Sequence, residues 1–302
     1  MAALFWSSAG LVIKWVQLPS LQIALFRSLI AGIFLGGYIF FQIRFKKIPF
    51  KMYFNKWALI TAICYTFTVS LFVMANKLTT SANAVFLQYT SPVTVILVSY
   101  FVLKERIYIL EIITVAVCLA GMALFFADEE KSTALVGNII GMLSGVAFAL
   151  LQISVKRSEE HAQAGNAAID QRVSDLRGVY HLMLGNAMTV IVLMTVITTL
   201  MQADAEGPLT ALAGNEFTLT SSDMLGLLFL GVVQLGCGYL CFAKGVHYIS
   251  NVEIAIYTLL EPICNPIWTF LGTGEIPGFW TVIGGMLVLG AMVINSVFGR
   301  KR

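Results

Sequence analysis

The stretch "YTSPVTVILVSYFVLKER" at residues 89–106 has a counterpart in "LLEPICNPIWTFLGTGEI" at residues 259–276. A gapless alignment at a shift of 170 residues places Pro92 on Pro262 and Glu105 on Glu275. Both stretches are apolar, contain a proline and end near an acid, so the chain carries one pattern twice. The second copy differs because Glu261 lies in the middle of its apolar run.

The composition is that of a protein surrounded by lipid. Hydrophobic residues make up 58% of the 302 residues and charged residues only 12%, about half the charged share of a soluble domain. The apolar residues form continuous runs of about twenty, enough for a helix to cross a hydrocarbon core of roughly 30 Å. Barrel strands would alternate over about ten residues instead. We therefore expect an all-α polytopic membrane protein.

These runs predict ten transmembrane helices. The first run begins at Met1 without a basic leader, which argues against a cleaved signal peptide; a shortened chain start is the alternative. The predicted spans are residues 1–16, 22–43, 57–76, 80–103, 107–127, 135–155, 178–201, 224–246, 252–272 and 279–298.

The ten predicted helices divide into two halves, residues 1–128 and residues 135–298. Because each half has an odd number of crossings, the second enters the membrane from the opposite side, and the halves form an inverted repeat. Lys14 and Lys156, each at the end of the first helix of its half, agree with this pairing. Such a repeat allows inward-open and outward-open packings around a site near the midplane.

Lys and Arg are unevenly distributed over the gaps between the predicted helices. Fifteen lie in gaps on one side, whereas the other side has little beyond Lys77 and Lys131 and is acidic. The positive-inside rule then places both termini in the cytoplasm. Residues 156–177 are expected to be a partly helical cytoplasmic segment, 202–223 an external loop and 299–302 a basic cytoplasmic tail. The net charge of +3 is a topology signal and does not indicate nucleic-acid binding.

We predict no metal site, cofactor or catalytic centre. The five cysteines all lie in apolar runs and are expected to be buried thiols without disulfides. Cys237 and Cys241 are four residues apart, but no His or second Cys pair has zinc-site spacing. The three histidines are scattered, and neither HExxH nor GxSxG occurs.

The chain resembles the drug/metabolite transporter superfamily, EamA type, over essentially its whole length. The matching elements are "WSSAGLVIK" (6–14), "ALFRSLIAG" (24–32), "TTSANAVFLQYTSPV" with "LKERI" (79–107), Glu261–Pro262 and "GGMLVLGA" (284–291). The resemblance implies ten helices in two inverted five-helix repeats around a central cavity. It also implies transport of small organic metabolites across the cytoplasmic membrane, often outward. The chain departs from the family pattern before the first helix, in the long 156–177 segment and in "GTGEIP" (272–277), which lacks a basic partner.

Glu261 is the sharpest functional candidate. A carboxylate inside hydrocarbon is costly unless it is paired, hydrated or protonated, so it marks a functional site by default. It could bind a cationic or amine-bearing substrate, or carry a proton exchanged for substrate. The structural alternative is a packing carboxyl group that bonds to a neighbour such as Arg27 or Tyr257.

Three prolines are expected to kink the helices that contain them. Pro92, Pro262 and Pro266 each lack an amide donor and free the carbonyl four residues earlier. A freed carbonyl at a cavity wall can meet substrate or water. A kink without ligand contact is the equal alternative.

Two cations lie within the predicted helices. Arg27 is either a structural anchor or a reader of carboxylate or phosphate, and Lys14 is better explained as snorkelling to the interface. The remaining polar candidates are expected to line the substrate site in part and to make interhelical hydrogen bonds in part. They are Trp6, Ser7, Tyr65, Asn83, Gln88, Tyr89, Gln152, Gln234, Tyr239, Tyr257 and Asn265.

These features favour a secondary transporter that works by alternating access, and the family resemblance implies export of amino acids or similar solutes. Its partners would be a small-molecule substrate and the lipid bilayer, without nucleic acid, and it would act as a monomer. If transport is ion-coupled, we expect proton antiport through Glu261. The alternatives are a channel, a scaffold membrane protein and, last, an intramembrane enzyme.

Overall fold

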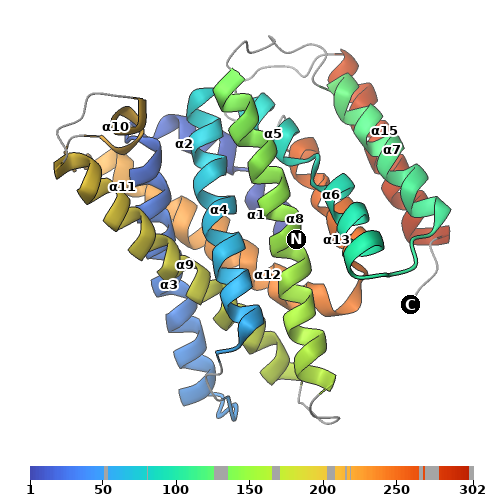
Figure 1. Cartoon of the computed structure of the whole chain (residues 1–302), viewed down its shortest axis with the longest axis horizontal. Coiled ribbons are helices and arrows are strands. Elements are labelled where there is room, and N and C mark those ends of the chain that lie inside the picture. Colours follow the sequence, from blue (N-terminus) through green and yellow to red (C-terminus); the bar gives the residue numbers. More distant parts are fainter. Residues whose placement is uncertain are drawn as a thin grey trace.

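We analysed a computed structural model of the chain, which is built from helices (Figure 1). It describes residues 1–50, 54–79, 81–125, 135–164, 171–202, 208–214, 216–217, 219–264, 268 and 279–298. In this described part all regular structure is helical, which confirms the all-α class.

The first half of the chain contributes α1 to α7. Their bounds are α1 Ala2–Trp6, α2 Ala9–Trp15, α3 Ser20–Arg44, α4 Lys56–Leu78, α5 Ser81–Gln88, α6 Ser91–Leu97 with a π-helical end Val98–Val102, and α7 Ile109–Phe125.

The second half contributes the remaining helices. These are α8 Leu135–Ala164, α9 Gln171–Gln202, α10 Pro208–Ala213, α11 Ser221–Leu228, the π-helix η2 Phe229–Cys237, α12 Gly238–Gly245, the 3-10 turn Val246–Tyr248, α13 Asn251–Thr258 and α15 Phe279–Phe298. Residues 260–264 add a short helical stretch after α13.

Among the described residues, six helical segments are long and apolar enough to cross a membrane. Three shorter apolar helices accompany them, at Ala2–Trp15, Ile109–Leu124 and Val282–Asn295. The architecture is therefore that of a polytopic membrane protein. The count of ten crossings and the inverted repeat stay predictions.

Both polar gaps contain helix, which was expected for residues 156–177 but not for residues 202–223. α8 continues to Ala164 and α9 already begins at Gln171, so the two helices extend into the predicted segment 156–177. Ala, Glu, Lys and Arg in this segment are good helix formers even where they are too polar for lipid. The predicted loop 202–223 likewise holds α10.

Two helices are interrupted one turn before a proline. α5 ends at Gln88, four residues before Pro92, and α13 ends at Thr258, four residues before Pro262. These are the residues whose carbonyls lose a helical partner, because proline has no N–H. Pro266 lies outside the described residues.

The interruptions also correspond in position. Gln88 and Thr258, the last residues of α5 and α13, are related by the same 170-residue shift that aligns the two prolines. This match is what a repeat predicts for the fourth helix of each half.

The helices pack in pairs that join the two halves of the chain. α4 packs on α8, α3 on α9 and α7 on α15. The α7–α15 pair lies at one edge of the bundle (Figure 1). There, a Cβ added to Gly121 would lie 2.9 Å from the carbonyl oxygen of Gly284, so glycine permits this close approach.

Candidate functional site

A small cavity lies among α1, α3, α4, α5, α8, η2, α12 and the 260–264 stretch. Its volume is about 30 Å³, which suits water but not an organic solute. Its walls hold one basic and one acidic side chain. The basic one lies in α3, which is apolar enough to span a membrane, and the acidic one lies in the 260–264 stretch. The lining residues are Trp6, Arg27, Thr68, Val69, Phe72, Gln88, Phe148, Gln234, Leu235, Tyr239 and Glu261.

Arg27 supplies the cation, two turns into α3. Its side chain is turned inward, with only 1% of the residue exposed, so it does not snorkel to an interface. Nη2 donates to the carbonyl oxygen of Val69 at 2.9 Å. Within the described residues, Nε and Nη1 are buried without a hydrogen-bond partner. A buried guanidinium with two free donor atoms is equipped to receive an anion.

Glu261 supplies the acidic group. It is 6% exposed and accepts a hydrogen bond from the hydroxyl of Tyr89, itself buried at the interruption between α5 and α6. The carboxylate thus bonds to Tyr89, and neither Arg27 nor Tyr257 is the partner that the structural alternative named. Because Tyr89 and Glu261 lie beside the two proline breaks, these breaks place the pair at the cavity.

Trp6 forms an aromatic wall of the cavity. Its ring centroid lies 5.0 Å from that of Tyr239 and 5.8 Å from that of Phe148. Gly238 makes this position possible, because an added Cβ would come within 2.4 Å of Trp6 Nε1. Nε1 is a second buried donor without a partner among the described residues. Trp6 and Arg27 therefore both offer N–H groups to one small space.

Amide and hydroxyl groups complete the surroundings. Gln88 Nε2 donates to Ser144 Oγ at 2.9 Å, which leaves the Gln88 side chain fixed in the wall. Tyr65 donates to Asn186 Oδ1 at 2.9 Å, and its ring lies 5.1 Å from that of Tyr239. Oε1 of Gln234 is buried without a partner in the described chain, so the cavity also contains an acceptor.

The structure sorts the candidates into three groups. Trp6, Gln88, Gln234, Tyr239 and Glu261 line the cavity, as does Arg27. Tyr65 and Tyr89 support lining residues. Four others have different contacts: Gln152 Nε2 donates to the Thr258 hydroxyl, the Ser7 hydroxyl accepts from Trp268 Nε1, Lys14 donates to the Thr79 carbonyl, and Tyr257 lines a separate apolar hollow. Asn265 and the side chain of Asn83 lie outside the described residues.

The sequence did not single out five lining residues: Thr68, Val69, Phe72, Phe148 and Leu235. All five lie in apolar helices and look like ordinary lipid-facing or core positions in a single sequence. In the part of the chain that the structure describes, no group of His, Cys, Asp and Glu has an arrangement that would hold a metal ion.

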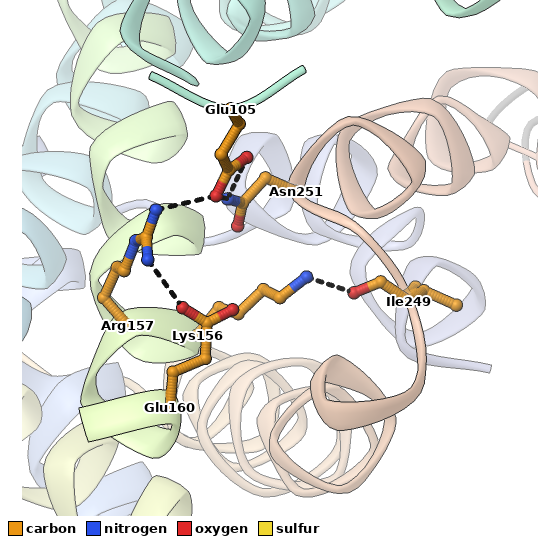
Figure 2. A network of polar contacts seen from close by, with 6 residues as sticks. All are labelled: Glu105, Lys156, Arg157, Glu160, Ile249 and Asn251. Atoms are coloured by element: carbon orange, nitrogen blue, oxygen red, sulfur yellow. Dashed lines mark hydrogen bonds and ion pairs between the residues drawn. The ribbon is translucent and has the colours of Figure 1, made fainter. Parts of the chain in front are cut away.

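At the basic end of the bundle, a polar network joins segments from both halves (Figure 2). Arg157 on α8 pairs with Glu105 at 2.7 Å and with Glu160 at 2.9 Å. Asn251, the first residue of α13, donates to both carboxylate oxygens of Glu105 at 3.1 and 3.2 Å. Glu105 therefore ties the chain before α7 to α8 and α13.

Two lysines make matching contacts at opposite ends. Lys14 Nζ donates to the carbonyl of Thr79 at 3.1 Å, and Lys156 Nζ donates to that of Ile249 at 2.6 Å (Figure 2 shows the second). Thr79 and Ile249 are again 170 residues apart, each two residues before α5 or α13. Lys14, for which snorkelling to the interface was predicted, thus donates its ammonium group to a backbone carbonyl.

Comparisons with known proteins agree with the resemblance seen in the sequence. The model of the EamA-like transporter family matches residues 1–127 and 180–297. A Bacillus subtilis protein called uncharacterized transporter YxxF is 22% identical, with 98% of this chain and 88% of that protein covered. The Salmonella typhimurium protein called uncharacterized inner membrane transporter YicL is 23% identical over 100% and 95% of the two chains. A solved crystal structure superposes with a TM-score of 0.72 at 15% identity, covering 99% and 95% of the two chains.

Proposed function

The chain belongs to the EamA-like transporter family, and on that premise we propose that it carries small zwitterionic metabolites, amino acids or similar solutes, through the Arg27–Glu261 cavity. The observation that carries this proposal is the presence of both buried charges in the wall of one cavity. Membrane transport in general follows from the family; the substrate class and mechanism are the proposal.

The free groups of the cavity match the two ends of an amino acid. A substrate carboxylate would accept hydrogen bonds from Arg27 Nε and Nη1 and from Trp6 Nε1, which lack partners among the described residues. A substrate ammonium would meet the carboxylate of Glu261, which Tyr89 orients. A solute with a single charge would leave the opposite group unpartnered in a dry site, which is strongly unfavourable.

Alternating access is the mechanism that fits a cavity of this size. At about 30 Å³ it is too small for an amino acid, so a solute can enter only after the surrounding helices separate. Contacts such as Glu105–Arg157 at the basic end and Lys77 Nζ to the Val16 carbonyl, 2.8 Å, at the other end would have to break in turn. The matched helix breaks and matched lysine contacts support an inverted repeat as the source of two equivalent packings.

The proposal also includes the orientation of the protein in the membrane and the direction of transport. The basic gaps place the ends of α3, α8 and α12 in the cytoplasm, together with both termini, in a cytoplasmic membrane. Export is proposed on family resemblance. Glu261 is the candidate for proton coupling, since the group that receives a substrate ammonium can receive a proton in its absence; solute exchange without an ion is the alternative.

The test is solute release from proteoliposomes. Vesicles loaded with a mixed pool of amino acids, amines and organic acids would be sampled over time and analysed by mass spectrometry. We expect selective, saturable loss of one amino-acid class, which is abolished in Arg27→Gln and is no longer driven by a pH gradient in Glu261→Gln. Arg44→Gln, on the exposed end of the same helix, is the matched control. Equal release of singly charged and zwitterionic solutes would contradict the proposed selectivity, and release without saturation would indicate a channel.

A further inference from the structure

A second polar hollow lies at the basic end of the bundle and shares no lining residue with the central cavity. Its volume is about 310 Å³, ten times that of the cavity. The end of α3, the segment that follows it, the start of α9 and the end of α12 form its walls. The lining residues are Tyr38, Gln42, Lys46, Ile48, Arg172, Asp175, Leu176 and Lys244.

The backbone after α3 is folded so that it closes one wall. The amide of Ile48 donates to the carbonyl of Gln42 at 3.3 Å, which turns the chain back towards the helix. Lys47 takes a left-handed φ of 52° within this turn, and Ile48 is 9% exposed. The turn thus fixes Lys46 and Ile48 in the wall of the hollow.

The charges of the hollow are unbalanced. Lys46, Arg172 and Lys244 come from three separate parts of the chain, whereas Asp175 is the single acid in the lining. Asp175 Oδ1 also lies 3.5 Å from Nε2 of the His247 imidazole. Cations from three segments that line one hollow give it a positive potential, which attracts anions.

Neutral groups of the hollow also suit an anion. Gln42 Nε2 donates to the Tyr38 hydroxyl at 2.6 Å, so the Tyr38 O–H remains able to donate to a ligand oxygen. Lys244 Nζ lies 5.4 Å from the centre of the Tyr38 ring, and this cation–π contact holds the ammonium group near the hydroxyl.

The positive-inside rule does not account for this arrangement. The rule requires Lys and Arg in cytoplasmic gaps, but it does not require them to converge on one hollow. Phe41 near the end of α3 and Phe45 directly after it are 47% and 65% exposed, and their ring centroids lie 5.2 Å apart. Exposed aromatic rings beside clustered cations are typical of the headgroup level of a membrane.

We propose that this hollow binds a phosphate-bearing anion, supplied by the headgroup of an anionic phospholipid or by a soluble phosphate ester. Lys46, Arg172 and Lys244 neutralise the phosphate charge, and Tyr38 donates to one of its oxygens. If the source is a lipid, its acyl chains lie along Phe41 and Phe45. The site is separate from the transport cavity and does not depend on the solute carried there.

The test uses the purified full-length protein in neutral detergent, titrated with phosphatidylglycerol and followed by native mass spectrometry. Phosphatidylcholine, which has the same phosphate but no net charge, is the lipid control. The variant Lys46→Gln/Lys244→Gln removes two lining cations, and Arg44→Gln/Lys47→Gln removes two neighbouring cations outside the lining. At about 1 kcal/mol for each cation, we expect the lining variant to bind phosphatidylglycerol about 30-fold more weakly.

Competition with glycerol phosphate distinguishes the sources. A phosphatidylglycerol adduct that glycerol phosphate does not displace identifies a lipid site, and displacement identifies a site for soluble phosphate esters; both outcomes support the proposal. Absence of both ligands from the wild type overturns it. Equal weakening in the two double variants also overturns it, because binding would then follow diffuse surface charge. Circular dichroism of each variant verifies that its helix content is retained.

Discussion

Replacing Arg27 by Met tests the transport cavity most directly. Met keeps an unbranched apolar side chain in the space of the arginine stem but removes all five N–H donors. We expect the variant to lose binding of zwitterionic solutes while it remains folded. It should also lose its discrimination against the decarboxylated amine, because the group that reads the carboxylate is gone.

The expected magnitude follows from the contacts of Arg27. Loss of one partner from a buried, hydrogen-bonded charge pair costs about 2–5 kcal/mol, which is a rise in KM of roughly 30-fold to several thousand-fold. Stability should change much less. The single hydrogen bond to Val69 O, 2.9 Å, contributes about 1.5–3 kcal/mol, and its loss is offset because a buried charge no longer has to be desolvated.

Counterflow of a labelled amino acid into preloaded proteoliposomes would measure KM, and thermal unfolding in detergent would measure stability. Arg27→Lys, which keeps the charge without the planar fork, should be intermediate. Arg44→Met is the control on the exposed end of α3. A KM within threefold of wild type for Arg27→Met would refute the role of this arginine in substrate recognition.

Three further changes test other parts of the structure. Gly238→Ala places a Cβ 2.4 Å from Trp6 Nε1, so we expect the free energy of unfolding in detergent to fall by about 1–3 kcal/mol and transport to weaken. Gly245→Ala is the control, because an added Cβ there has no atom within 4 Å and should have no effect; equal effects of the two changes would contradict the argument. Glu261→Gln should abolish transport driven by a pH gradient but keep solute exchange, as counterflow at several pH values would reveal; an unchanged pH dependence would exclude proton coupling through this residue. Glu105→Gln weakens a part-exposed ion pair by about 1 kcal/mol, so amide exchange at the start of α13 should rise about fivefold, and unchanged exchange would mean that Glu105 does not hold α13.

The sequence predicted the helical class well because helices that face lipid consist almost entirely of apolar residues. Runs such as residues 57–76 and 279–298 contain almost no charge, and their helices, Lys56–Leu78 and Phe279–Phe298, cover them fully. Helix ends in polar segments were predicted less well. Hydropathy marks where lipid ends, whereas α8 continues to Ala164 because backbone hydrogen bonds and helix propensity do not need lipid.

The cavity was predictable only through its charges. Glu261 and Arg27 are conspicuous because an ionised side chain is rare in an apolar run. Phe148 and Leu235 have no such signal, since any apolar side chain suits both lipid and a cavity wall. Tyr89 was a candidate, but its bond to Glu261 joins residues 172 positions apart and depends on packing that no single stretch of sequence contains.

The matched features explain why only one copy of the duplicated pattern, residues 259–276, has an acid in the middle of its apolar run. In both copies a helix breaks four residues before a proline, and a lysine contacts the backbone just before that helix, Lys14 at Thr79 and Lys156 at Ile249. A shared break places the residues that follow it at the centre of the bundle. There the copies diverge: Tyr89 comes from one and Glu261 from the other, and they bond to each other. Two identical acids at this point would repel, whereas a hydroxyl and a carboxyl group form a hydrogen bond beside the cavity that Arg27 also lines. The duplicated pattern thus accounts for the matched breaks, and the difference between its copies accounts for the acid in the cavity wall.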